Sequence, residues 1–121
     1  MNVLFDSGVP KGLRDYLAPH SVTRSQQLGW ASFSNGELLS RAQVEFDALI
    51  TTDSNLQYQQ NPHDYDLIVI VLRGFKISLK NYLPLVGEIM NHIETGEAGR
   101  LIYVYEDELL RERDQQRGTV H

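Results

Sequence analysis

The sequence contains no cysteine and no long apolar segment. Without cysteine, disulfides and thiolate metal sites are excluded, and such a composition is usual in a reducing cytoplasm. The longest apolar run, at residues 67–72, is too short to span a bilayer. Residues 1–6 lack the basic and apolar regions of a secretory signal. We therefore expect a cytoplasmic protein with no membrane partner.

The chain also lacks an excess of basic residues. Its formal net charge is −5, which argues against broad nucleic-acid binding through a positively charged surface. A nuclease is still compatible with this charge, because acids that cluster around a metal ion contribute negative charge themselves. The length of 121 residues is typical of one domain with a core of its own.

Short apolar runs alternate with amphipathic segments along the chain. Ser34 and Glu37 have the spacing of a capping box and predict the start of a helix. Pro84 interrupts the last long helix near its start, and we expect Asn81 to cap the main part of that helix. Strands are predicted at residues 2–5, 21–24, 47–52, 67–72 and 100–105. This alternation predicts a three-layer, Rossmann-like α/β domain: a mainly parallel sheet of about five strands with helices on both faces.

We expect this domain to occupy residues 1–105. Residues 106–121 follow as a charged tail with five acids and three arginines. The tail is expected to be solvated and frayed. The alternative is that Leu109 and Leu110 contact a partner.

Three acids are predicted to meet at one edge of the sheet. Asp6 follows the first strand and Asp53 follows the third, so both open onto the edge where parallel strands end. Glu37 lies in the first turn of the helix that leads into the third strand, which places it near the same edge. Convergent carboxylates attract a hard cation such as Mg²⁺ or Mn²⁺. That ion would support hydrolysis of a phosphodiester, with all three acids as metal ligands and catalytic groups.

Each acid also has a purely structural interpretation. Glu37 stands where a capping box places a glutamate. Asp6 has the position of a cap for the first helix, and Asp53 could cap a turn through Ser54 and Asn55. The functional interpretation therefore depends on the three acids lying together.

Candidate substrate contacts lie near the same edge. Arg73 ends the central strand, Lys76 follows it, and Asn55 stands close to Asp53, so these side chains could hold a nucleic-acid backbone. For Lys76 the competing interpretation is a solvated helix start. Trp30, the only tryptophan, is expected to pack over a helix face rather than stack on a base.

Five short segments, in this order, resemble the small PIN-like domains of bacteria, which are relatives of the VapC-type toxins of toxin–antitoxin pairs. The segments are residues 3–6, 28–30, 35–39, 48–55 and 68–73, within a resemblance that covers about residues 2–105. The resemblance implies a Mg²⁺- or Mn²⁺-dependent endoribonuclease site at Asp6, Glu37 and Asp53, with Asn55 at a position where many relatives carry an acid or asparagine. It also implies RNA as substrate, an antitoxin protein as partner and a homodimer.

The chain departs from that pattern next to the acids. Ser7 and Gly8 stand where relatives commonly have Glu-Asn, Asn35 where they often have Asp, and Leu56 where they often have an aromatic residue. The alternative is therefore a PIN-like domain with weakened catalysis that acts as a binding or regulatory module. A third possibility, a phosphotransfer receiver-like domain, would need a lysine near the last strand, and none follows that strand here.

Overall fold

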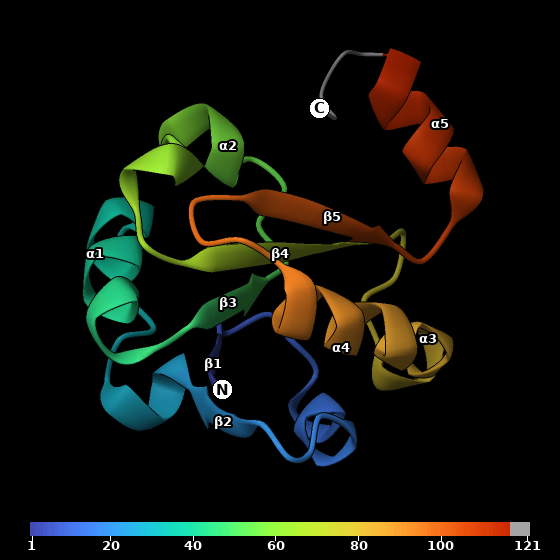
Figure 1. Ribbon diagram of the computed structural model, residues 1–121. Coiled ribbons are helices and arrows are strands. Elements are labelled where there is room, and N and C mark those ends of the chain that lie inside the picture. Colours follow the sequence, from blue (N-terminus) through green and yellow to red (C-terminus); the bar gives the residue numbers. More distant parts are fainter. Residues whose placement is uncertain (117–121) are drawn as a thin grey trace.

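A computed structural model describes residues 1–116 of the chain, which fold around a parallel sheet (Figure 1). The strands are β1 (Asn2–Phe5), β2 (Ser21–Arg24), β3 (Ala48–Thr51), β4 (Ile68–Arg73) and β5 (Leu101–Tyr105). They form a five-stranded sheet in the order β2-β1-β3-β4-β5, and every neighbouring pair is parallel. The predicted α/β class and the parallel sheet are confirmed.

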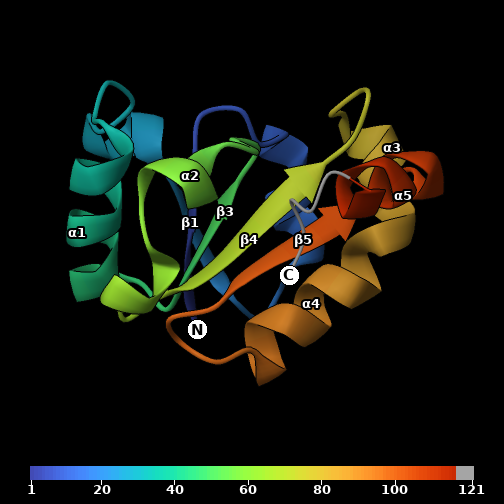
Figure 2. The ribbon, with the colours of Figure 1, turned by 90° about the horizontal axis from the view of Figure 1, so that it is seen from above.

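The helices cover both faces of this sheet, with α1 and α2 on one side and α3 and α4 on the other (Figures 1 and 2). The α-helices are α1 (Asn35–Glu45), α2 (Leu56–Gln59), α3 (Leu79–Tyr82), α4 (Val86–Thr95) and α5 (Glu108–Gln116). The 3₁₀ helices are η1 (Lys11–Tyr16), η2 (Ser25–Leu28), η3 (Pro62–Asp64) and η4 (Leu83–Leu85). In residues 1–116, no helix is long and apolar enough to cross a membrane.

The core consists of two apolar layers because alternate residues of each strand point to opposite faces. On β3, Ala48 and Ile50 pack toward one layer and Leu49 toward the other, and all three are buried. The first layer joins the sheet to side chains from η1, α3 and α4: Leu13, Tyr82, Ile89 and Ile93. The second layer joins it to side chains from α1: Leu38, Leu39 and Ala42. Burial on both faces explains why β4 is an unbroken apolar run.

The start of α1 confirms Ser34 as the N-cap but not the full capping box, because the Glu37 side chain accepts from the Ser34 hydroxyl and not from its backbone N–H. The Ser34 hydroxyl oxygen accepts a hydrogen bond from the backbone N–H of Glu37 at 3.3 Å. The same hydroxyl also lies 3.3 Å from the Glu37 carboxylate, to which it donates. The cap therefore fixes both the first turn of α1 and the side chain of Glu37.

The segment around Pro84 differs from its prediction. Ser78, not Asn81, is the N-cap: its hydroxyl accepts from the Asn81 N–H at 3.3 Å, and Asn81 lies inside α3. Proline has no N–H to continue that helix, so Pro84 instead lies within the short turn η4, which begins at Leu83, and α4 starts at Val86. The expected single helix is thus three consecutive pieces.

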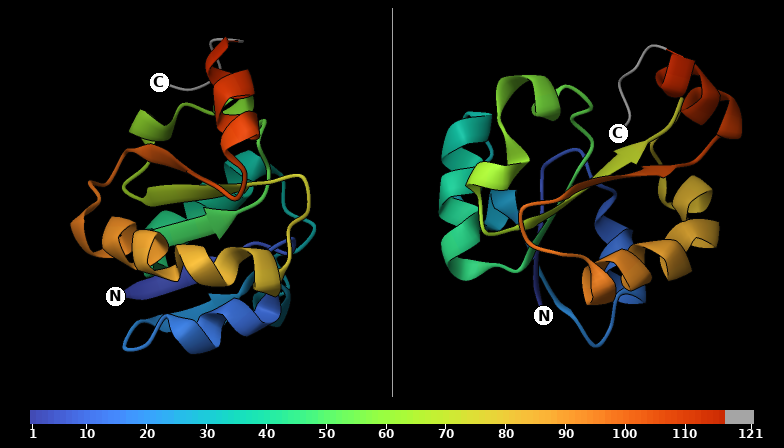
Figure 3. Two further views of the ribbon diagram at one scale, coloured as in Figure 1. Left: turned by 90° about the vertical axis from the view of Figure 1, so that its right-hand side faces the viewer. Right: turned by 45° about the horizontal axis from the view of Figure 1, so that its top comes forward.

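The expectation of a solvated tail is wrong for residues 108–116, which form α5 directly after β5 (Figure 3). Leu110 and Asp114 stand four residues apart on one face of this helix, and each is only 3% exposed. Burial of this apolar side chain and this acid against the sheet holds the helix in place. Leu109, by contrast, is 67% exposed. Residues 117–121 of the predicted tail lie outside the described part of the chain.

A partly buried ion pair joins α5 to β4. The Asp114 carboxylate accepts hydrogen bonds from Arg73 Nε and Nη2, each at 2.8 Å, and from the Tyr105 hydroxyl at 3.0 Å. The hydrogen bond with Asp114 raises the pKa of Arg73 above its usual value. Arg73 is thus a structural contact of α5 in this conformation.

Two buried tyrosines predict a loss of stability at high pH. Burial raises the pKa values of both Tyr82 and Tyr105. The negative charge of Glu106 raises the pKa of Tyr82 further, and the hydrogen bond with Asp114 raises that of Tyr105 further. Above about pH 10 the unfolded chain releases these protons while the folded chain retains them, so the free energy of unfolding falls as pH rises.

Urea denaturation from pH 8 to 11 checks this expectation. A Tyr82→Phe/Tyr105→Phe variant should show a shallower decline than wild type, and an identical decline would contradict it. At pH 7, Tyr105→Phe should cost about 1.5–3 kcal/mol because it removes a hydrogen bond to a charged group. Tyr82→Phe should cost little, because the Tyr82 hydroxyl has no hydrogen-bond partner within residues 1–116.

Candidate functional site

The strand order reverses direction between β1 and β3. From β1 the chain crosses to β2 on one side, and the later strands build outward from β3 on the other side. In open α/β sheets, ligands bind beyond the carboxyl ends of the strands at such a reversal of direction. Asp6 follows β1, and Asp53 lies two residues beyond the end of β3. Their strands are in register there, with Phe5 beside Ile50.

A chain of hydrogen bonds connects these two acids through Thr51, the last residue of β3. Thr51 is fully buried. Its hydroxyl donates to Asp6 Oδ2 at 2.9 Å and accepts from the backbone N–H of Asp53 at 3.1 Å. Asp53 Oδ2 in turn accepts from the side-chain amide of Asn35 at 2.9 Å. Three segments that are distant in sequence therefore meet at one place.

A glycine permits the loops after β1 and β3 to approach each other. A Cβ atom added at Gly8 would lie 2.3 Å from the Thr52 hydroxyl oxygen, a distance that real Cβ atoms essentially never show. A larger residue at position 8 would require the Thr52 side chain to move, so the loops after β1 and β3 pack closely at this point.

Glu37 does not join this network. Its side chain is exposed, and it accepts the hydrogen bond from Ser34 that belongs to the helix cap. Across residues 1–116, no group of three or more acidic, histidine or cysteine side chains is placed to hold a metal ion. The structure therefore brings together two of the three predicted carboxylates, Asp6 and Asp53, and leaves the third at the start of α1.

The donor set formed by Asp6 and Asp53 fits a small hard cation. Backbone N–H groups of Ser7 and Asn55 donate to the remaining oxygen of each carboxylate, at 2.8 and 3.0 Å respectively. These hydrogen bonds fix both carboxylates and leave lone pairs available. Mg²⁺ is commonly bound by one or two carboxylates, with waters and substrate phosphate completing its coordination. Two oriented carboxylates at a half-buried edge therefore suit Mg²⁺ or Mn²⁺.

The predicted substrate residues have different environments. Lys76 and Asn55 are exposed beyond the ends of β4 and β3, and their roles stay predictions. Arg73 directs its guanidinium to Asp114. Trp30 stacks on Phe33 with ring centroids 5.7 Å apart and packs on the α1 layer, which confirms its expected structural role.

Two neighbours of the predicted residues were not themselves predicted: Thr51 beside Asp6 and Asp53, and Asp114 beside Arg73. Thr51 was part of the recognised strand end, but nothing in its type showed that its hydroxyl would join both acids. Asp114 lies in the presumed tail, and its four-residue spacing from Leu110 was the only available signal of a buried helix face.

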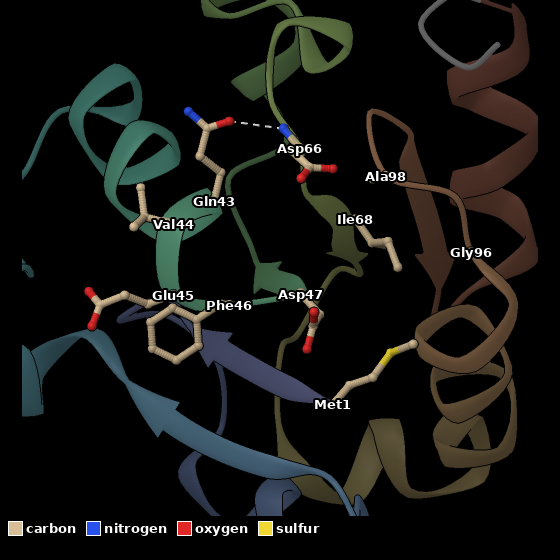
Figure 4. A pocket seen from close by; sticks show the side chains of 10 residues that line it. All are labelled: Met1, Gln43, Val44, Glu45, Phe46, Asp47, Asp66, Ile68, Gly96 and Ala98. Atoms are coloured by element: carbon tan, nitrogen blue, oxygen red, sulfur yellow. Dashed lines mark hydrogen bonds between the residues drawn. The ribbon is translucent and has the colours of Figure 1, made fainter.

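A separate pocket of about 330 Å³ lies at the opposite edge, where the strands begin. Figure 4 shows Asp47 and Asp66 lining it, with the Gln43 side chain accepting a hydrogen bond from the Asp66 N–H at 2.9 Å. None of the predicted site residues lines this pocket. Asp47 and Asp66 are therefore acids at the amino edge of the sheet, and substitutions of them can serve as controls for substitutions of Asp6 and Asp53.

Comparison with protein-family models, with curated proteins and with solved structures finds no match to this chain. A functional assignment therefore has to rest on the chemistry of the site and on the resemblance of the five short segments. The carboxyl edge between β1 and β3 supplies that chemistry.

Proposed function

We propose that this chain is a metal-dependent endoribonuclease of the PIN-like kind, which hydrolyses RNA phosphodiester bonds at the carboxyl edge of the sheet. The observation that carries the proposal is the hydrogen-bonded chain from Asn35 through Asp53 and Thr51 to Asp6. It holds two carboxylates in fixed orientations at the place where an α/β sheet binds ligands. A structural cap would need neither the second acid nor the buried hydroxyl.

In this proposal Asp6 and Asp53 hold Mg²⁺ or Mn²⁺, and the other groups orient them. Thr51 fixes the Asp6 carboxylate, and Asn35 fixes that of Asp53, as second-layer hydrogen bonds commonly do for metal ligands. The bound ion would acidify a water molecule and offset charge on the phosphate. Glu37, on the helix that also carries Asn35, is the third acid and would exchange its bond from Ser34 for contact with substrate or water.

RNA would approach from the exposed edge, where Asn55 and Lys76 can contact phosphate groups. The resemblance to VapC-type domains extends the proposal to the toxin of a toxin–antitoxin pair. Expression should then arrest growth, and a neighbouring antitoxin protein should relieve the arrest.

A binding or regulatory module is the second candidate. It is favoured by the position of Glu37, whose carboxylate belongs to a cap, and by the absence of a three-acid group across residues 1–116. In this candidate function, RNA binds at the same edge of the sheet but is not cleaved there.

Cleavage of RNA by the purified chain separates the two candidates. With Mn²⁺ present we expect endonucleolytic products from a mixed single-stranded RNA, no products with excess EDTA, and recovery when Mn²⁺ is added back. The Asp66→Asn variant, altered at the opposite edge, should cleave like wild type. RNA binding without cleavage would establish the module, and cleavage that resists EDTA would contradict the metal mechanism.

A further inference from the structure

Arg73 leaves the sheet on the same face as the groups of the proposed site. Val71 of β4 packs in the apolar layer on the α1 side, so Arg73, the next alternate residue of that strand, is on this face too. On β3, Leu49 packs in the same layer, which places Thr51 on this face as well. The Thr51 hydroxyl donates to Asp6 at 2.9 Å. The cation at the end of β4 therefore shares one face of the sheet with this acid.

The register of the strands also places Arg73 beside the end of β3. Thr51 pairs with Val71 of β4. Asp53 follows Thr51 by two residues, and Arg73 follows Val71 by two residues. Neighbouring strands lie about 4.8 Å apart. Arg73 thus starts one strand away from the loop that carries Asp53, at the edge where RNA is proposed to bind.

The Asp114 carboxylate binds Arg73 in the way that a phosphate group would. Its two oxygens accept from Arg73 Nε and Nη2, each at 2.8 Å, and the Tyr105 hydroxyl donates to one of them at 3.0 Å. Two parallel hydrogen bonds from one guanidinium are the arrangement by which arginine binds both carboxylates and phosphates. The Asp114 side chain is 4% exposed and that of Arg73 is 25% exposed. The guanidinium therefore keeps a side that is open to solvent.

The helix that carries Asp114 has a small buried face. Of the nine residues of α5, Leu110 and Asp114 are the buried ones, and Leu109 is 67% exposed. Figure 1 shows α5 rising from the carboxyl end of β5, on the side of the sheet where α2 also lies. Elements with few buried contacts open locally while the rest of a protein stays folded. A competitor for Arg73 could therefore release α5 without unfolding the sheet.

We propose that α5 is an autoinhibitory latch, in which the Asp114 carboxylate fills a subsite that takes a phosphate group of RNA when α5 is released. The Arg73 guanidinium and the Tyr105 hydroxyl form this subsite. The inference rests on the proposed function, because it places RNA at the carboxyl edge of the sheet. RNA and α5 compete for the same guanidinium, so the apparent affinity for RNA is reduced by the fraction of molecules in which α5 is docked.

Fluorescence anisotropy with a labelled single-stranded RNA of mixed sequence, in excess EDTA, tests this competition without cleavage. We expect Asp114→Asn to bind the RNA at least about fivefold more tightly than wild type, because it weakens the docking of α5 and frees Arg73. Glu112→Gln removes an exposed acid from the same helix and is the matched control, with an affinity within about twofold of wild type. The Arg73→Met/Asp114→Asn variant should lose the gain, because the cation that binds phosphate is absent.

Hydrogen exchange of the wild-type chain is a second measurement, which needs no variant. Addition of the RNA should speed amide exchange across α5, whereas a purely structural helix would exchange at an unchanged or slower rate and would contradict the latch. Circular dichroism establishes that each variant is folded. Equal RNA affinity of Asp114→Asn and wild type would overturn the inference. A gain that survives replacement of Arg73, or that Glu112→Gln reproduces, would overturn it as well, because loss of negative charge alone would then explain the gain.

The latch and the proposed nuclease can fail separately. A chain that shows the gain through Arg73 but does not cleave RNA with Mn²⁺ would support the latch and refute the nuclease. A chain that cleaves RNA with Mn²⁺ but shows no gain in Asp114→Asn would support the nuclease and refute the latch.

Discussion

Replacement of Arg73 by methionine is expected to lower the free energy of unfolding by about 3–5 kcal/mol. The change removes a guanidinium that donates two hydrogen bonds to the Asp114 carboxylate, whose side chain is 4% exposed. Tyr105 would still donate to this buried negative charge. Urea denaturation at pH 7 measures the cost, and faster amide exchange across α5 should accompany it, because release of that helix hydrates Asp114.

Replacement of Asp114, the partner of Arg73, should lower the free energy of unfolding by less. Arg73 has a side chain that is 25% exposed, so in Asp114→Asn its guanidinium can turn to water, and we expect a loss of about 1–3 kcal/mol. An Arg73→Met/Asp114→Leu variant should be more stable than Arg73→Met, because no buried charge remains. A loss below about 1 kcal/mol in Arg73→Met would show that the pair does not hold α5 to the sheet.

Replacement of Asp53 by asparagine is expected to reduce Mn²⁺-dependent RNA cleavage on the order of 100-fold or more, since it removes a negatively charged metal ligand. The change preserves side-chain size, and an asparagine oxygen can still accept from Asn35. Thermal stability should therefore stay close to that of wild type. Initial rates at saturating RNA and several Mn²⁺ concentrations provide the measurement, with Asp66→Asn as the matched control.

Asn35→Ala gives a graded comparison at the same carboxylate. It removes the donor that orients Asp53, so cleavage should fall by roughly 10–100-fold and recover in part at higher Mn²⁺, as expected for an orienting residue. Equal activity of Asp53→Asn and wild type would exclude Asp53 from catalysis.

Much of the fold was predictable because the strands are short, buried and bounded by polar residues. The first two strands occupy the predicted residues, and β4 begins and ends within one residue of its prediction. The helix around Pro84 was harder to predict, because both serine and asparagine are good caps, and in the structure Ser78 caps the turn that buries Tyr82 in the core. The burial of α5 was not predicted because the segment is highly charged, and Asp114 has the same residue type as acids that are solvated.

The candidate site was predictable in position and only partly in detail. Parallel topology alone places Asp6 and Asp53 at one edge. The bridging role of Thr51 depends on the register between β1 and β3, which composition does not specify. Glu37 was ambiguous for a physical reason: a helix cap and a metal site use the same carboxylate, and in this structure the cap holds it.

Calorimetric titration with Mn²⁺ measures metal binding at Asp6 and Asp53 without the correct RNA or a partner protein. We expect wild-type protein to bind a single Mn²⁺, and Asp6→Asn and Asp53→Asn each to abolish the binding heat while Asp66→Asn preserves it. Wild-type protein that binds no Mn²⁺, or binding that survives both site variants, would contradict a metal site at the carboxyl ends of β1 and β3.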